Sequence, residues 1–132
     1  EFSGCMIRAS IVTVSDRGAA GEREDRSGPA IREMISGFCE IVGCMIVPDE
    51  IDDIRNALVS MSEKSDLIIT TGGTGVSPRD LTPEATRDVI DREVPGMVEA
   101  MRHESMKKTP YAMISRAVAG IRGSTLIINL PG

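Results

Sequence analysis

The spacing of apolar and polar residues changes repeatedly along the chain. Continuous apolar runs over 5–15, 40–47 and 66–69 are typical of buried strands, because both faces of each segment are apolar. Between them, residues 27–38 and 51–63 carry apolar side chains at spacings of three and four, which predicts amphipathic helices. This order of strand, helix, strand, helix and strand predicts a parallel sheet with right-handed crossovers.

The second half of the chain predicts further helices and strands. Apolar spacing indicates a helix over 82–92 and, after a proline-glycine break, another over 97–104. Apolar runs predict strands over 113–121 and 125–130, joined only by a turn at Gly123-Ser124. Strands joined by so short a turn run antiparallel. We therefore expect an α/β fold with a mostly parallel sheet and one antiparallel edge strand.

Length and composition indicate a single domain. The 132 residues predict one domain over 5–132, and residues 1–4, which lack an initiator Met, are interpreted as a remnant outside it. The net charge of −5 and the aromatic content of 2% argue against a nucleic-acid partner. No apolar run approaches the roughly 20 residues that cross a bilayer, which argues against a membrane segment. The sequence stops at Pro131-Gly132, directly after a strand, so we expect a covering C-terminal helix to be missing.

The cysteines indicate a reducing compartment. Cys5, Cys39 and Cys44 are odd in number, lack C-x-x-C spacing and have a single histidine to join them. This composition argues against a disulfide framework and against a zinc site. We interpret the cysteines as small core residues of a cytoplasmic protein.

A glycine-rich loop follows the strand at 66–69. In Thr70-Thr71-Gly72-Gly73-Thr74-Gly75, three of the last four residues are glycine, so several backbone N–H groups can approach one anionic ligand. The loop is not a Walker A sequence, which ends in Lys and then Ser or Thr, nor a dinucleotide fingerprint, because Pro78 interrupts it and no helix follows directly. We expect it to bind a phosphate or similar oxyanion; the alternative is that the glycines form only a tight turn.

Three acids follow predicted strands at short distances. Asp16, Asp49 and Asp80 each lie a few residues beyond a strand, and the carboxyl ends of parallel strands share one edge of the sheet. Carboxylates beside a bound phosphate would repel it, and Mg²⁺ held by one or two carboxylates together with phosphate oxygens removes that conflict. The residues therefore predict phosphoryl or nucleotidyl transfer, in which positioning and charge neutralisation supply most of the catalysis.

Each charged residue also has a structural interpretation. Asp49 follows a proline before a helix and could be its N-cap, and Asp80 could cap or brace the glycine loop. Arg79 could bind a substrate anion or pair with Asp80 or Glu84 at the surface. Spacing alone does not separate these alternatives.

Taken together, these segments resemble the molybdenum-cofactor biosynthesis family that includes the molybdopterin adenylyltransferases. The resemblance runs from Ile7 to Gly132. It is carried by Thr13-Val14-Ser15-Asp16-Arg17, Asp25-Arg26-Ser27-Gly28, Val47-Pro48-Asp49-Glu50, Thr70 to Gly75, Pro78-Arg79-Asp80-Leu81-Thr82-Pro83-Glu84-Ala85-Thr86, Asp91-Arg92-Glu93-Val94-Pro95-Gly96, Ser115-Arg116 and Asn129-Leu130-Pro131-Gly132.

The resemblance implies a three-layer αβα sandwich that assembles as a homotrimer. It also implies an enzyme that uses ATP and Mg²⁺ to adenylylate molybdopterin, releasing pyrophosphate. It implies that Asp49 and Asp80 are the catalytic and magnesium-binding acids. The substrate-binding residues that it implies are Thr71, Gly72, Gly73, Thr74, Gly75, Ser77, Arg79, Asp16, Ser27, Pro131 and Gly132. Two other classes stay open: a non-catalytic molybdopterin-binding homologue, and a scaffold domain similar to the N-terminal part of a receptor-clustering protein.

Overall fold

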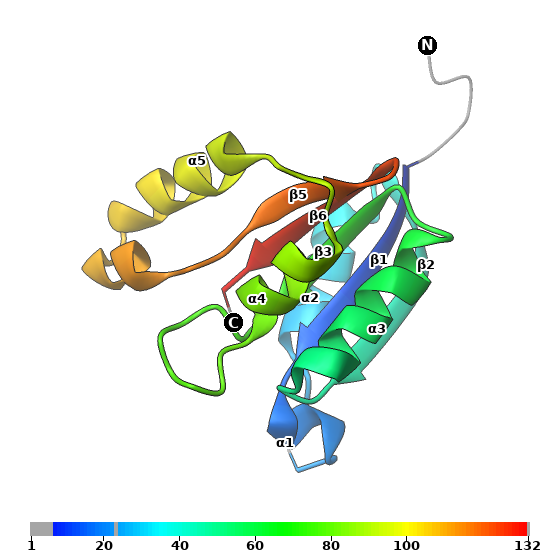
Figure 1. The fold of residues 1–132 in the computed structure, drawn as a ribbon, viewed down its shortest axis with the longest axis horizontal. Coiled ribbons are helices and arrows are strands. Elements are labelled where there is room, and N and C mark those ends of the chain that lie inside the picture. Colours follow the sequence, from blue (N-terminus) through cyan, green and yellow to red (C-terminus); the bar gives the residue numbers. More distant parts are fainter. Residues whose placement is uncertain (1–6, 23, 132) are drawn as a thin grey trace.

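The computed structural model describes residues 7–22 and 24–131, which form one six-stranded sheet with helices on both faces (Figure 1). The strand order is β2-β1-β3-β6-β5-β4. The elements are β1 (Ile7–Val14), α1 (Asp16–Ala19), α2 (Ser27–Ile35), β2 (Cys39–Val47), α3 (Ile51–Ser62), β3 (Leu67–Thr71), α4 (Thr82–Val89), β4 (Arg92–Glu93), α5 (Pro95–Met106), the 3₁₀-helix η1 (Pro110–Ile114), β5 (Ala119–Arg122) and β6 (Thr125–Leu130).

Four neighbouring strands of the sheet are parallel. β1 pairs with β2 on one side and with β3 on the other, and β3 pairs with β6, all in parallel register. Their carboxyl ends therefore meet at one edge, where the glycine loop leaves β3. The antiparallel pairings, of β6 with β5 and of β5 with β4, lie at one side of the sheet, as expected from the short turn before β6.

The apolar residues on both faces of β1 separate two cores. Ile11 packs with α2 residues Ile31 and Ile35 on one face. The adjacent Val12 packs on the other face against α3 and α4, through residues such as Leu58 and Val89. Successive side chains of a strand point to opposite faces, so a strand between two helical layers must be apolar throughout. The three-layer prediction is confirmed, and Figure 1 shows α3 and α4 in front of the sheet and α2 behind it.

Two predicted elements end earlier or begin later than expected. The helix predicted over 27–38 ends at Ile35, and Phe38, assigned to its apolar face, is 59% exposed. The strand predicted over 113–121 begins only at Ala119. Ahead of it, Pro110 starts a 3₁₀-helix, because its fixed φ suits a first helical turn and the preceding Thr109 side chain accepts a hydrogen bond from the Tyr111 N–H.

Smaller differences affect helix ends and cysteines. α4 ends at Val89 rather than near residue 92, and the chain then adds the short strand β4, which sequence spacing did not predict. Cys39 is buried as expected, whereas Cys44 is exposed on β2, the strand at the other side of the sheet. Cys5 lies outside the described residues. Among the helices that the structure describes, none has the length and apolar composition to cross a membrane.

Candidate functional site

The glycine loop turns sharply as it leaves β3. Gly72 and Gly73 have φ of 96° and 71°, a conformation that side chains with a Cβ rarely adopt. The Gly72 N–H donates to the Leu130 carbonyl at 3.1 Å, and a Cβ on Gly72 would collide with the Val14 carbonyl. The loop thus begins in close contact with the ends of β6 and β1, which only glycine permits.

Thr82 ties the other end of the loop back to its beginning. Its hydroxyl donates to the Gly72 carbonyl at 2.9 Å, and its N–H donates to the Gly73 carbonyl at 3.2 Å. Thr82 is the first residue of α4 and is fully buried. Residues 72–82 therefore form a closed loop whose two ends are fixed to each other.

Asp16 and Asp49 bind each other, because the main-chain N–H of each donates to the carboxylate of the other. The Asp16 N–H donates to Asp49 Oδ2 at 3.0 Å, and the Asp49 N–H donates to Asp16 Oδ1 at 2.9 Å. Asp49 does not cap α3, whose N-cap is Glu50 without a side-chain hydrogen bond. This reciprocal pair joins the end of β1 to the end of β2 and leaves Asp49 Oδ1 facing the loop, 3.3 Å from where a Cβ on Gly73 would lie.

The two paired acids have pKa values shifted in opposite directions. A hydrogen bond from Arg79, followed by the one from the Asp49 N–H, lowers the pKa of Asp16. Burial raises the pKa of Asp49, and the nearby negative charges of Asp16 and Asp80 raise it further. The hydrogen bond from the Asp16 N–H and the charge of Arg79 lower it, but by less. Neighbouring carboxyl groups with divergent pKa values are typical of functional sites.

Arg79 pairs with neither partner that the sequence suggested. Its Nη2 lies 2.7 Å from Asp16 Oδ2 and its Nη1 lies 3.0 Å from Glu50 Oε2. The Arg79 side chain is 57% exposed, so this pairing is accessible to solvent. A cation beside Asp16 and Glu50 partly balances the acids around Asp49.

Asp80 braces the loop with one oxygen. Its Oδ2 accepts the Ser77 N–H at 2.9 Å and lies 2.8 Å from where a Cβ on Gly75 would be. Its Oδ1 accepts no hydrogen bond from the residues in 7–22 and 24–131, and the same holds for Asp49 Oδ1. The structure thus places a carboxylate against each of two loop glycines, Gly73 and Gly75, and leaves one oxygen of each acid available.

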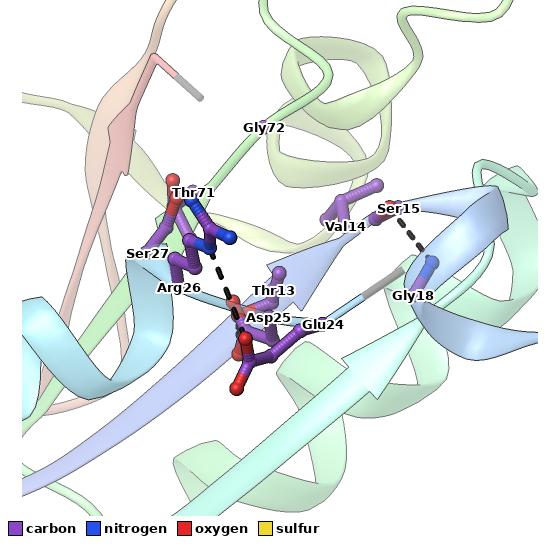
Figure 2. Close-up of a pocket in the computed structure, with 10 residues that line it drawn as sticks. All are labelled: Thr13, Val14, Ser15, Gly18, Glu24, Asp25, Arg26, Ser27, Thr71 and Gly72. Carbon is purple, nitrogen blue, oxygen red and sulfur yellow. Dashed lines mark hydrogen bonds and ion pairs between the residues drawn. The ribbon is translucent and has the colours of Figure 1, made fainter. Parts of the chain in front are cut away.

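Two cavities adjoin the loop, and Gly72 lines both. The first, of about 490 Å³, is lined by Thr71 and Ser27 among others, and Figure 2 shows these two residues across from Val14 and Ser15. The second, of about 470 Å³, is lined by the following residues of the expected site: Gly72, Gly73, Thr74, Gly75, Asp80 and Pro131. The expected site residues that line neither cavity are Asp16, Asp49, Ser77 and Arg79, and Gly132 lies outside the described residues.

The free carboxylate oxygens of the site fit a cation that takes most of its ligands from water and from a bound phosphate. Within the part of the chain that the structure describes, no group of three or more His, Cys, Asp or Glu side chains could hold a metal ion. Asp49 Oδ1 and Asp80 Oδ1 could supply carboxylate ligands. Mg²⁺ commonly binds through one or two carboxylates, with phosphate oxygens and water completing its six ligands.

Comparison with known proteins identifies the family. The chain matches the family model described as "Probable molybdopterin binding domain" over residues 10–132. The chain belongs to this molybdopterin-binding family. Two relatives are named molybdopterin adenylyltransferase. The Helicobacter pylori J99 protein is 44% identical over 96% of this chain and 74% of its own length. The Escherichia coli K12 protein is 39% identical over 96% of this chain and 67% of its own length. The crystal structure of the molybdopterin biosynthesis enzyme MoaB from Thermus thermophilus matches with a TM-score of 0.90 at 52% identity, covering 96% of this chain and 82% of that one.

In this member of the molybdopterin-binding family, two further polar residues connect elements near the site, and neither is among the expected site residues. Asp25, two residues before the start of α2, accepts the Gly28 N–H at 3.1 Å and the Thr13 hydroxyl at 3.0 Å, and it lines the first cavity. Asn129 is fully buried and donates to the hydroxyls of Thr70 and Thr86, each at 3.0 Å. An acid three residues before a helical glycine, and an amide inside an apolar strand, were the available signals.

Proposed function

We propose that this protein is a molybdopterin adenylyltransferase of molybdenum cofactor biosynthesis. It transfers the adenylyl group of ATP to the terminal phosphate of molybdopterin, with Mg²⁺, and it acts as a cytoplasmic homotrimer. The names of the relatives from Helicobacter pylori and Escherichia coli support the reaction class.

One observation of the site carries this proposal. Asp49 and Asp80 follow different strands of the sheet, and each lies against a glycine of the same loop, Gly73 and Gly75 respectively. Glycine amides attract a phosphate and carboxylates repel it, so the arrangement suits a ligand in which a divalent cation accompanies a polyphosphate. ATP with Mg²⁺ has this composition.

In the proposed reaction, an oxygen of the molybdopterin phosphate forms a bond to the α-phosphorus of ATP. The bond from that phosphorus to the bridging oxygen breaks, and pyrophosphate leaves with the electron pair. Asp49 and Asp80 would hold Mg²⁺, which would supply positive charge beside the phosphate oxygens. The glycine-loop amides bind the anion, and the hydrogen bond from the Asp16 N–H orients Asp49. Asp16 and Glu50 compete with a substrate anion for the Arg79 guanidinium.

The direct test is to incubate the protein with molybdopterin, ATP and Mg²⁺ and to measure adenylylated molybdopterin and pyrophosphate. Equal amounts of both products are expected. Asp49→Asn and Asp80→Asn should each lower kcat about 100-fold or more, because charge neutralisation is lost at the reacting phosphate. Asp53→Asn, on the exposed first turn of α3, is the matched control and should leave the rate unchanged.

A non-catalytic binding homologue is the second candidate. The hydrogen bond from the Ser77 N–H to Asp80 favours it, because that acid has a structural use independent of catalysis. Molybdopterin binding without any product, in the presence of ATP and Mg²⁺, would support the binding protein and refute the enzyme.

A further inference from the structure

Arg116 contacts the glycine loop from a distant part of the chain. It lies between η1 and β5, and its N–H donates to the Thr74 carbonyl at 2.8 Å. Its side chain reaches further along the same loop: Nε donates to the Gly75 carbonyl at 2.8 Å and Nη2 donates to the Asp80 carbonyl at 2.6 Å. Three carbonyl groups of the loop therefore turn toward one residue.

Glu84 holds the Arg116 side chain in this position. Nη1 donates to Glu84 Oε2 at 2.5 Å and Nη2 to Glu84 Oε1 at 3.3 Å. The hydrogen bond to Arg116 lowers the pKa of Glu84, and Glu84 in turn raises the pKa of Arg116. Because Glu84 is in the first turn of α4, the guanidinium joins the loop to the helix that follows it.

The direction of the carbonyl groups determines the direction of the neighbouring amides. In a trans peptide the C=O of one residue and the N–H of the next point in opposite directions. With the Thr74 and Gly75 carbonyls turned toward Arg116, the Gly75 and Val76 N–H groups point away from it. Those two N–H groups donate to no acceptor within 7–22 and 24–131. Successive free amides on a glycine-rich turn form an anion-binding surface.

We propose that Arg116 is a positioning residue that orients the Gly75 and Val76 amides and fixes the backbone of Asp80 for the transfer reaction. The proposal rests on the function proposed above. A planar guanidinium can donate to two carbonyls and a carboxylate at once, whereas the single ammonium of lysine cannot reproduce that arrangement. Arg116→Lys therefore keeps the charge opposite Glu84 and loses the orientation of the loop.

The test compares Arg116→Lys and Arg116→Ala with the wild type in the adenylylation assay. Arg116→Lys should lower kcat about 10- to 100-fold with a smaller change in KM for ATP, because small misplacement at a phosphoryl-transfer site is costly. Amide hydrogen exchange over residues 72–81 should become faster in both variants, and guanidinium ion should partly restore the activity of Arg116→Ala. Arg8→Ala is the control, because Arg8 makes a similar ion pair with Asp66, remote from the loop. This variant should leave both kcat and the amide exchange over 72–81 unchanged.

Several outcomes would overturn the role of Arg116. A wild-type kcat in Arg116→Lys would do so, as would unchanged amide exchange over 72–81. A loss of activity accompanied by faster exchange throughout the protein, without rescue by guanidinium, would show a general structural role instead. If the wild type itself gives no product, the proposed function fails, and the exchange measurement alone decides whether Arg116 orients the loop. If Arg116→Ala does not fold, Arg116→Lys supplies both readouts.

Discussion

The contact between Gly72 and the end of β1 allows a quantitative prediction for Gly72→Ala. Gly72 has φ of 96°, and an added Cβ would collide with the carbonyl oxygen of Val14. That oxygen cannot move aside as a flexible side chain would, because Val14 is the last residue of β1 and pairs with Val47 of β2. The substitution therefore introduces both backbone strain and a collision with a fixed atom.

The two contributions can be added. A residue with a Cβ in the left-handed region costs about 1–2 kcal/mol, and overpacking against a fixed neighbour costs about 1–3 kcal/mol. The free energy of unfolding should therefore fall by about 2–5 kcal/mol, a large part of the stability of a domain of this size. Gly123→Ala is the matched control, because Gly123 has φ of 59° and nothing lies within 4 Å of its added Cβ. The free energy of unfolding of Gly123→Ala should fall only by the cost of the backbone strain, about 1–2 kcal/mol.

Urea unfolding at equilibrium, followed by circular dichroism, measures both losses. The difference between the two variants isolates the collision with Val14 and should be about 1–3 kcal/mol. If Gly72→Ala loses no more stability than Gly123→Ala, the close approach of the loop to β1 is wrong. An unchanged slope of the free energy against urea would show that the denatured state is the same in both variants.

Two further predictions concern polar groups that connect separate elements. Asn129→Ala leaves the buried Val118 N–H without its acceptor, which lies at 3.1 Å. The free energy of unfolding, measured by thermal unfolding, should therefore fall by about 1–3 kcal/mol, and an unchanged stability would contradict this. The hydrogen bond to Arg116 holds the pKa of Glu84 below its ordinary value of 4.5, so this pair stabilises the fold above that pH, and the stabilisation is lost as the pH falls through the folded-state pKa. The stability difference between wild type and Glu84→Gln should therefore shrink below about pH 4.5, and a difference that grows on acidification would refute the pairing.

Most of the elements could be predicted from the sequence because their signals are local. The apolar run containing Ile11 and Val12 indicated a strand covered on both faces, and the two residues do pack into different cores. The glycines at 72 and 73 indicated a turn that other residues avoid, and both have positive φ. A pattern of this kind depends only on neighbours along the chain, so it survives without knowledge of the tertiary contacts.

Local patterns were insufficient at helix ends and at charged residues. Phe38 continues the helical spacing of α2, yet α2 ends before it and its side chain is exposed. For Asp49 the sequence left open whether it caps α3 or belongs to the site; its carboxylate binds the Asp16 N–H, because the ends of β1 and β2 lie side by side. A carboxylate can satisfy only a few donors, and spacing along the chain does not show which donor is nearest in space.

The sequence by itself determined the class of fold, the position of the glycine loop and the residue types available for chemistry there. Only the tertiary structure decided which charges meet. Arg79 pairs with Asp16 across 63 positions of the chain, and Arg116 reaches the Asp80 carbonyl across 36. Such contacts depend on the order of strands in the sheet and on their register, which a local pattern of apolar residues does not encode. The sheet brings these segments to one edge, and long arginine side chains then reach acceptors that no spacing rule identifies.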